Sequence, residues 1–176
     1  MLKEKAGITG FTLIEVVAVL IVLSILAAVA VTVMGDDSAR LAAQTEALKA
    51  NIRYSQALSM TTGRCWGIRM DKGNGTYWIF NCDDPPNCPQ ASNRVCPPGM
   101  ECDGANRFLM GEDFGVSLSF PGENPGVLSF DVFGRPFWDS GDAALQTLLA
   151  ADLTLTLTDS PNSTSIVISA ETGCVP

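Results

Sequence analysis

Apolar residues are most concentrated near the start of the chain. Residues 11–34 form an unbroken apolar run in which Glu15 is the sole charged side chain. A helix over 11–34 would span about 36 Å, more than the roughly 30 Å of a bilayer's hydrocarbon core. We therefore predict a transmembrane helix here. A lone acid in such a helix marks a function and a partner.

A second helical pattern follows the polar residues Gly35-Asp36-Asp37-Ser38. No proline occurs before Pro85, so we expect one long helix whose second half covers 35–62 and lies against the rest of the chain. Gly63 is in the usual position for a C-terminal stop. The stripe that we expect to be buried contains Leu41, Leu48, Ile52, Ser55 and Ser59.

Short strand patterns dominate residues 63–176. Strands at 65–70 and 76–80 flank a five-residue loop, Asp71–Gly75, and predict a hairpin. Strict alternation at 153–158 and 165–170 predicts strands that bury one face only. Further strands are expected at 107–110, 116–120, 127–132 and 136–138. The predicted fold is α+β, with the long N-terminal helix packed on an antiparallel, sandwich-like β-sheet domain.

The junction before the apolar run carries a motif. A short leader containing Lys3 and Lys5 precedes Gly10-Phe11-Thr12-Leu13-Ile14-Glu15. A secretory signal peptide would have an apolar core of about 7–15 residues and a cleavage site beyond it. A bare membrane anchor would not need the acid. The motif resembles the prepilin cleavage and methylation signature shared by type IV pilins and the pseudopilins of type II secretion, which implies the pilin fold.

The resemblance implies a processing route. Prepilin peptidase would remove residues 1–10 by cutting between Gly10 and Phe11, and would then methylate the Phe11 amine. The protein would wait in lipid of the bacterial inner membrane as a single-pass protein, with a cytoplasmic N-terminus and a periplasmic C-terminal domain. An inner-membrane assembly platform would then add it to a periplasmic or surface fibre with other pilins or pseudopilins.

Glu15 has an assembly role in this scheme. In the family it pairs with the N-terminal amine of a neighbouring subunit, here Phe11. The two residues are also about 6 Å apart along one helix, so an intramolecular contact is an alternative. Only the intermolecular contact would set the register of packing.

A second, looser resemblance concerns the C-terminal half. The segments 130–136 (FDVFGRP) and 166–173 (IVISAETG) are similar to the globular domain of the GspH/FimT class of minor pilins and pseudopilins. Minor subunits start or cap a fibre, and some type IV members bind DNA through a basic C-terminal motif. This chain ends in Glu171-Thr172-Gly173-Cys174-Val175-Pro176 without a basic cluster.

The composition argues against nucleic acid and against catalysis. The chain has 11 basic and 19 acidic side chains and no histidine, with a net charge of −8. This balance disfavours nucleic acid as a partner, and the lack of histidine removes the commonest general base and catalytic metal ligand. No nucleophile elbow or phosphate loop occurs. We expect no enzyme activity and no catalytic residues.

Six cysteines follow the apolar run, and four of them lie in a loop at 82–102 rich in Pro, Asn and Asp. An even number in an exported domain indicates disulfides, and the spacings supply no Cys-x2-Cys metal pair. The pairing is open, although Cys65 and Cys82 would face each other across the hairpin. The candidates are Cys65, Cys82, Cys88, Cys96, Cys102 and Cys174.

The predicted function is that of a structural minor pseudopilin of type II secretion at or near a fibre tip. A minor pilin of a type IV pilus, acting in assembly priming, adhesion or DNA uptake, is the alternative. A ligand-binding tip module is a further one, because Trp66, Trp78 and Trp138 would form either an exposed aromatic surface or core packing. We expect no cofactor and no metal site, although calcium at Asp71–Gly75 or Asp83-Asp84 is chemically possible.

Overall fold

The structure is a computed structural model that describes residues 12–33, 37–82, 88, 91–141 and 143–176. The chain divides into two compact units, residues 1–36 and 37–176. The first contains helix α1 (Leu13–Val33). The second begins with helix α2 (Asp37–Thr62), so this helix belongs to the same unit as the β-strands.

The single long helix that we predicted is wrong, because α1 and α2 are separate helices. The sequence between them offers a reason. Gly35 is a poor helix former, and acidic residues such as Asp37 favour the start of a new helix. The fold is α+β with antiparallel sheets, and among the described residues two helices stand in place of the one predicted.

The predictions of a transmembrane segment and of a single-pass position in the inner membrane are also wrong. Within the described ranges, no helix combines the length and the apolar character needed to cross a bilayer. Helix α1 contains 21 residues and begins at Leu13. It also carries the carboxylate of Glu15 in its first turn.

The larger of two sheets is built on a central hairpin. Strands β1 (Cys65–Asp71) and β2 (Thr76–Cys82) pair as predicted, and the order is β3-β2-β1-β6-β7. Strand β4 pairs with β2 beside β3. The remaining strands are shorter than these two: β3 (Arg94–Val95), β4 (Phe108–Leu109), β6 (Gly126–Phe130) and β7 (Pro136–Ser140).

The second sheet has the order β5-β8-β9, with all pairs antiparallel. Its strands are β5 (Ser117–Ser119), β8 (Leu153–Asp159) and β9 (Asn162–Ile168). Alternate side chains of β8 and β9 are buried, which confirms the predicted one-sided burial. Two short helices complete the fold, η1 (Ala91–Asn93) and α3 (Met110–Phe114).

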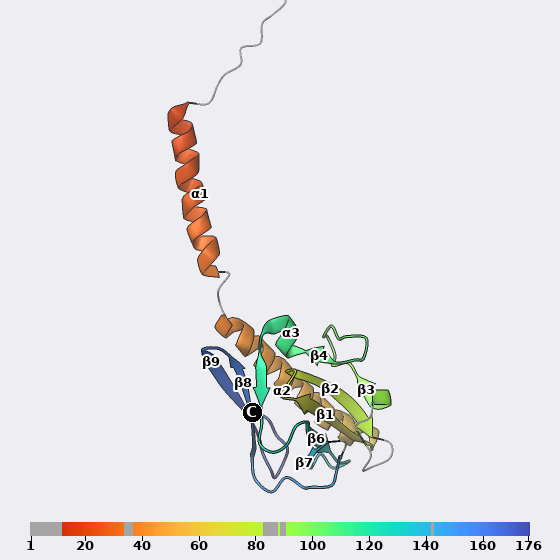
Figure 1. The fold of residues 1–176 in the computed structure, drawn as a ribbon. Helices are drawn as coiled ribbons and strands as arrows, with labels where there is room; N and C mark the ends of the chain where they lie inside the picture. Colours follow the sequence, from red (N-terminus) through yellow and green to blue (C-terminus); the bar gives the residue numbers. More distant parts are fainter. Residues whose placement is uncertain (1–11, 34–36, 83–87, 89–90, 142) are drawn as a thin grey trace, which may run out of the picture. The chain divides into compact units, whose positions relative to one another are not determined.

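Helix α2 joins the two sheets. It contacts β1 and β6 of the larger sheet and β8 and β9 of the smaller one (Figure 1). Its predicted buried stripe is confirmed, since Leu41, Leu48, Ile52, Ser55 and Ser59 are all at most 4% exposed. The helix therefore fills the centre of the core in the second unit and brings distant parts of the chain to its flanks.

Candidate functional site

The predicted assembly residue Glu15 lies in the first turn of α1, with its side chain exposed. Its backbone N–H donates to the Thr12 carbonyl at 3.1 Å and to Thr12 Oγ1 at 3.4 Å. Thr12 thus acts as an N-cap, and a carboxylate three residues later favours this helix end. Glu15 therefore has a local structural role besides any role in assembly. Gly10 and Phe11, the predicted processing residues, lie outside the described residues.

The rest of α1 presents an uncovered apolar surface. Each large apolar side chain between Leu13 and Leu26 is exposed, with exposed fractions from 45% to 82%. A contiguous apolar surface of this kind marks an interaction site. Nothing within residues 12–27 other than Glu15 adds charge to it.

The two C-terminal motif segments meet at one side chain of α2. Gln56 Nε2 donates to the carbonyl oxygen of Gly134 at 2.9 Å and to that of Thr172 at 2.7 Å. Gly173 needs its lack of a side chain here, because a Cβ would approach Gln56 Nε2 to 2.8 Å at a φ of +66°. The structure thus brings 130–136 and 166–173 together on α2, which sequence patterns alone did not show.

The turn after β6 is held by one carboxylate. Asp131 accepts hydrogen bonds from the backbone N–H groups of Phe133 and Arg135, and it pairs with the Arg135 guanidinium at 2.6 Å. Phe133 at the tip of this turn is 76% exposed. A large aromatic side chain presented by a fixed turn is a candidate contact for a partner.

Two disulfides form, and each closes a short loop. They are Cys82–Cys88 and Cys96–Cys102, and each joins residues six positions apart. Cys65 is opposite Cys82 in the hairpin register, as predicted, but it remains a free, buried thiol. Cys174 is free and exposed. The expectation of disulfides is confirmed for four of the six candidates.

Burial, together with the nearby carboxylates Asp131 and Asp139, raises the pKa of the Cys65 thiol to about 12. The thiolate is the reactive form of cysteine. Cys65 is therefore protonated at neutral pH, and its thiol is a weak nucleophile. It packs among Trp78, Phe80 and Cys82.

The three tryptophans pack against separate neighbours and do not form one shared aromatic surface. Trp78 is 5% exposed, and the guanidinium of Arg94 lies over its ring at 4.4 Å from the centroid. Trp138 packs edge-on against Phe120 at 5.5 Å between centroids. Trp66 Nε1 donates to Thr62 Oγ1 at 3.0 Å. Each ring is thus held by a different set of neighbours.

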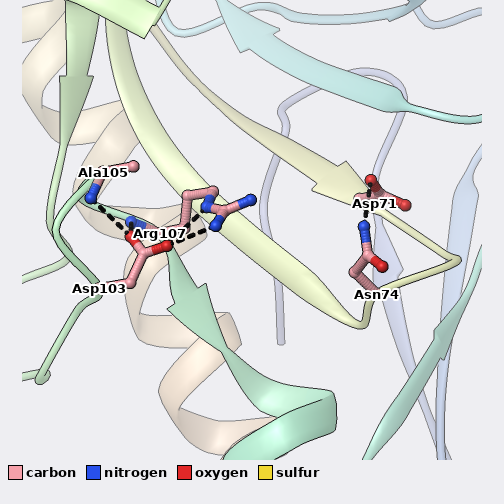
Figure 2. A network of polar contacts seen from close by, with 5 residues as sticks. All are labelled: Asp71, Asn74, Asp103, Ala105 and Arg107. Carbon is pink, nitrogen blue, oxygen red and sulfur yellow. Dashed lines mark hydrogen bonds and ion pairs between the residues drawn. The ribbon is translucent and has the colours of Figure 1, made fainter.

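The candidate calcium loop is closed by hydrogen bonds. Asp71 accepts them from Gly73 N–H at 2.9 Å, from Asn74 Nδ2 at 3.3 Å and from Asn124 Nδ2 at 3.0 Å (Figure 2 shows Asp71 and Asn74). Burial raises the pKa of Asp71, but these hydrogen bonds lower it by more than burial raises it, so the net shift is downward.

No group of three or more metal-ligating side chains occurs in the part of the chain that the structure describes. Asp83-Asp84 lies outside those residues, so calcium at that point is untested.

A second polar turn lies near this loop. Asp103 accepts hydrogen bonds from the backbone N–H groups of Arg107 and Ala105, and it pairs with the Arg107 guanidinium at 2.6 Å (Figure 2). These hydrogen bonds lower the pKa of Asp103. A cavity of about 520 Å³ beside the turn is lined by both Lys72 and Glu112. The mixed charge of its walls selects no ligand class.

Comparison of the chain with protein-family models, with curated proteins and with solved structures found no match. The resemblance to pilins and pseudopilins therefore rests on the residues quoted above.

Proposed function

We propose that this chain is a structural subunit of a pilin-like fibre, a minor pseudopilin of a type II secretion system. Prepilin peptidase would cut it between Gly10 and Phe11 and methylate Phe11. A minor pilin of a type IV pilus is the second candidate, because the same N-terminal segment serves both machines. The observation that carries the proposal is the exposed apolar surface of α1 with Glu15 at its N-terminal end.

An exposed apolar helix surface of this extent is stabilised by burial against a partner surface. Exposed fractions of 45% or more along residues 13–26 leave many methyl groups in water, at a cost of about 25 cal/mol per Å² of apolar area. Helices of the same type from neighbouring subunits provide an apolar partner surface. Packing α1 among such helices in a fibre core would remove this surface from water.

Glu15 gains its importance from that packing. Its exposed side chain would become buried among apolar neighbours, where an unpaired carboxylate costs several kcal/mol. The amine that cleavage creates at Phe11 is a cation that would pair with it. An amine from the neighbouring subunit would fix the register between subunits, whereas an amine from the same chain would neutralise the charge without setting a register.

The residues 37–176 would form the head that the fibre carries. Two disulfides stabilise its loops, which suits an exported domain. The exposed Phe133 on its fixed turn favours the further candidate, a ligand-binding tip module. That activity would add to the fibre role and would not replace it.

Incorporation into fibres tests the proposal. Wild-type protein, Glu15→Ala and Glu15→Gln would be expressed in a host deleted for the gene, and sheared or purified fibres would be probed by immunoblot. We expect both variants to be depleted from fibres at least tenfold at equal cellular levels. Glu112→Ala, which removes an exposed carboxylate of the head, is the matched control and should be incorporated normally. Normal incorporation of Glu15→Ala would contradict the role of Glu15.

Mass spectrometry of the mature protein tests the processing step. We expect a chain that begins with N-methylated Phe11, and an unprocessed N-terminus would contradict the proposal.

The phenotype of the deletion host distinguishes the type II secretion system from the type IV pilus. Loss of protein secretion alone supports the pseudopilin, and loss of piliation alone supports the minor pilin. Intact assembly with failed surface adhesion, reproduced by Phe133→Ala, would favour the tip-binding module.

A further inference from the structure

A cavity of about 510 Å³ opens in the head between α2, the loop closed by Cys96–Cys102, and the segment from β4 to α3. Gln44 of α2 lines it, together with Met100 and Glu101 of the loop. Phe108, Asp113 and Phe114 line the opposite side. All of these residues belong to the unit 37–176.

The apolar walls of the cavity are aromatic and firmly placed. The rings of Phe108 and Phe114 stack with centroids 5.7 Å apart and an interplanar angle of 28°. Met100 is held from behind, because Tyr77 Oη lies 3.2 Å and Asn51 Nδ2 3.5 Å from its sulfur. The Cys96–Cys102 disulfide closes the loop that carries Met100 and Glu101. The cavity is thus a built feature and does not depend on a free loop.

Three side chains around the cavity offer hydrogen-bond acceptors. Gln44 is 9% exposed, and its Oε1 is buried without a hydrogen-bond donor among the described residues. A buried amide oxygen without a donor is energetically unfavourable. Glu101 and Asp113 are exposed at the rim. Within the described part of the chain, no basic side chain pairs with either carboxylate.

We infer that this cavity binds a basic side chain, lysine or arginine, of a protein partner. The apolar stem of such a side chain would lie along Met100 and the stacked rings, where the aromatic faces also attract a cation. Its N–H groups would supply the donor that Gln44 Oε1 lacks. Glu101 and Asp113 would neutralise its charge, and they would repel an anionic ligand.

The inference does not depend on the proposed fibre role, because it concerns only the head. Binding to the full chain would be measured by NMR with methyl-labelled methionine. The probes are N-acetyl-lysine methylamide and N-acetyl-arginine methylamide, and N-acetyl-norleucine methylamide is the uncharged control. We expect the two basic compounds to shift the Met100 methyl signal saturably and the norleucine compound to bind at least fivefold more weakly. Equal binding of all three, or no saturable shift, would overturn the inference.

Substitutions separate the site from general attraction to an acidic protein. Glu101→Gln combined with Asp113→Asn, and separately Gln44→Leu, should each weaken binding of the lysine compound at least fivefold. Glu112→Gln is the matched control, because Glu112 is an exposed neighbour in α3 that does not line this cavity. If Glu112→Gln weakened binding as much as the double variant, bulk charge would explain the binding and the site would be refuted.

Discussion

Cys65 and Cys82 lie directly opposite each other on β1 and β2, yet Cys82 is bonded to Cys88 and Cys65 keeps its thiol. The two strands are joined here by backbone pairing and do not need a disulfide between them. The sulfur of Cys82 instead serves the loop that follows it. One consequence is that the chain holds two thiols of opposite character, buried Cys65 and exposed Cys174.

Iodoacetamide at pH 8 should distinguish these thiols. We expect the folded, unreduced protein to gain one label, on Cys174, because Cys65 is buried and its pKa is raised to about 12. Unfolding in urea without reductant should expose the second thiol. Peptide mapping by mass spectrometry checks both sites, and Cys174→Ser should leave the folded protein unlabelled. Rapid native labelling of Cys65, or a Cys65–Cys82 peptide, would contradict the structure.

Removing the Tyr77 hydroxyl should destabilise the head by about 1–3 kcal/mol. This hydroxyl accepts a hydrogen bond from Asn51 Nδ2 at 3.0 Å, and both residues are buried. Tyr77→Phe would therefore leave the Asn51 amide without this partner. Urea unfolding monitored by circular dichroism gives the free energy of unfolding. Tyr54→Phe is the matched control, since Tyr54 is 39% exposed, and a similar loss in both variants would contradict the prediction.

Gly67→Ala should be among the most damaging single substitutions. A Cβ at position 67 would lie 2.5 Å from the Leu128 carbonyl oxygen and 2.6 Å from the Phe80 ring. Backbone atoms in a central strand pair cannot move away freely, so we expect a loss of about 1–3 kcal/mol or more. Gly104→Ala is the control, because nothing lies within 4 Å of a Cβ there. Thermal unfolding compares the two, and equal melting temperatures would refute the prediction.

Acid should weaken the β1–β2 turn through Asp71. Its pKa is lowered in the folded state, so the carboxylate contributes stability that is fully present above its unfolded pKa of about 4. That contribution is lost as the pH falls through the lower, folded pKa. Asp71→Asn should therefore show a smaller loss of stability between pH 5 and pH 2 in urea titrations, these pH limits lying roughly either side of that value.

Glu171→Gln, at an exposed carboxylate far along the chain, controls for the general effect of charge in this titration. An unchanged pH dependence in Asp71→Asn would show that the turn contributes nothing to acid sensitivity.

Periodic patterns predicted the parts of the fold that depend on local burial. The stripe of α2, the β1–β2 hairpin and the alternating β8 and β9 all match the pattern of apolar residues. Helix α3 was missed because its five residues are too few to show a helical period. The division into two helices, α1 and α2, was missed because glycine and acidic residues only weaken a helix, and the apolar run and the helical stripe on either side both favour a helix.

The sites that depend on contacts between distant segments were not predictable. Gln56 hydrogen-bonds to both Gly134 and Thr172, which lie 78 and 116 positions after it in the sequence. Gln44 faces a cavity whose other walls come from two later segments, the Cys96–Cys102 loop and the segment from β4 to α3. Neither glutamine stands out in the sequence, because its importance comes from backbone carbonyls and aromatic rings that only the folded chain brings near.

The far end of the chain is built into the head. Arg53 donates to the Val175 carbonyl from Nε at 3.0 Å and from Nη2 at 2.8 Å, and Val175 is 2% exposed. One flank of helix α2, which begins at Asp37, is therefore covered by a segment that lies 122 positions after Arg53 in the sequence. Forming this contact brings together segments 122 positions apart in the sequence, and pairings of such long range are the slow ones in folding.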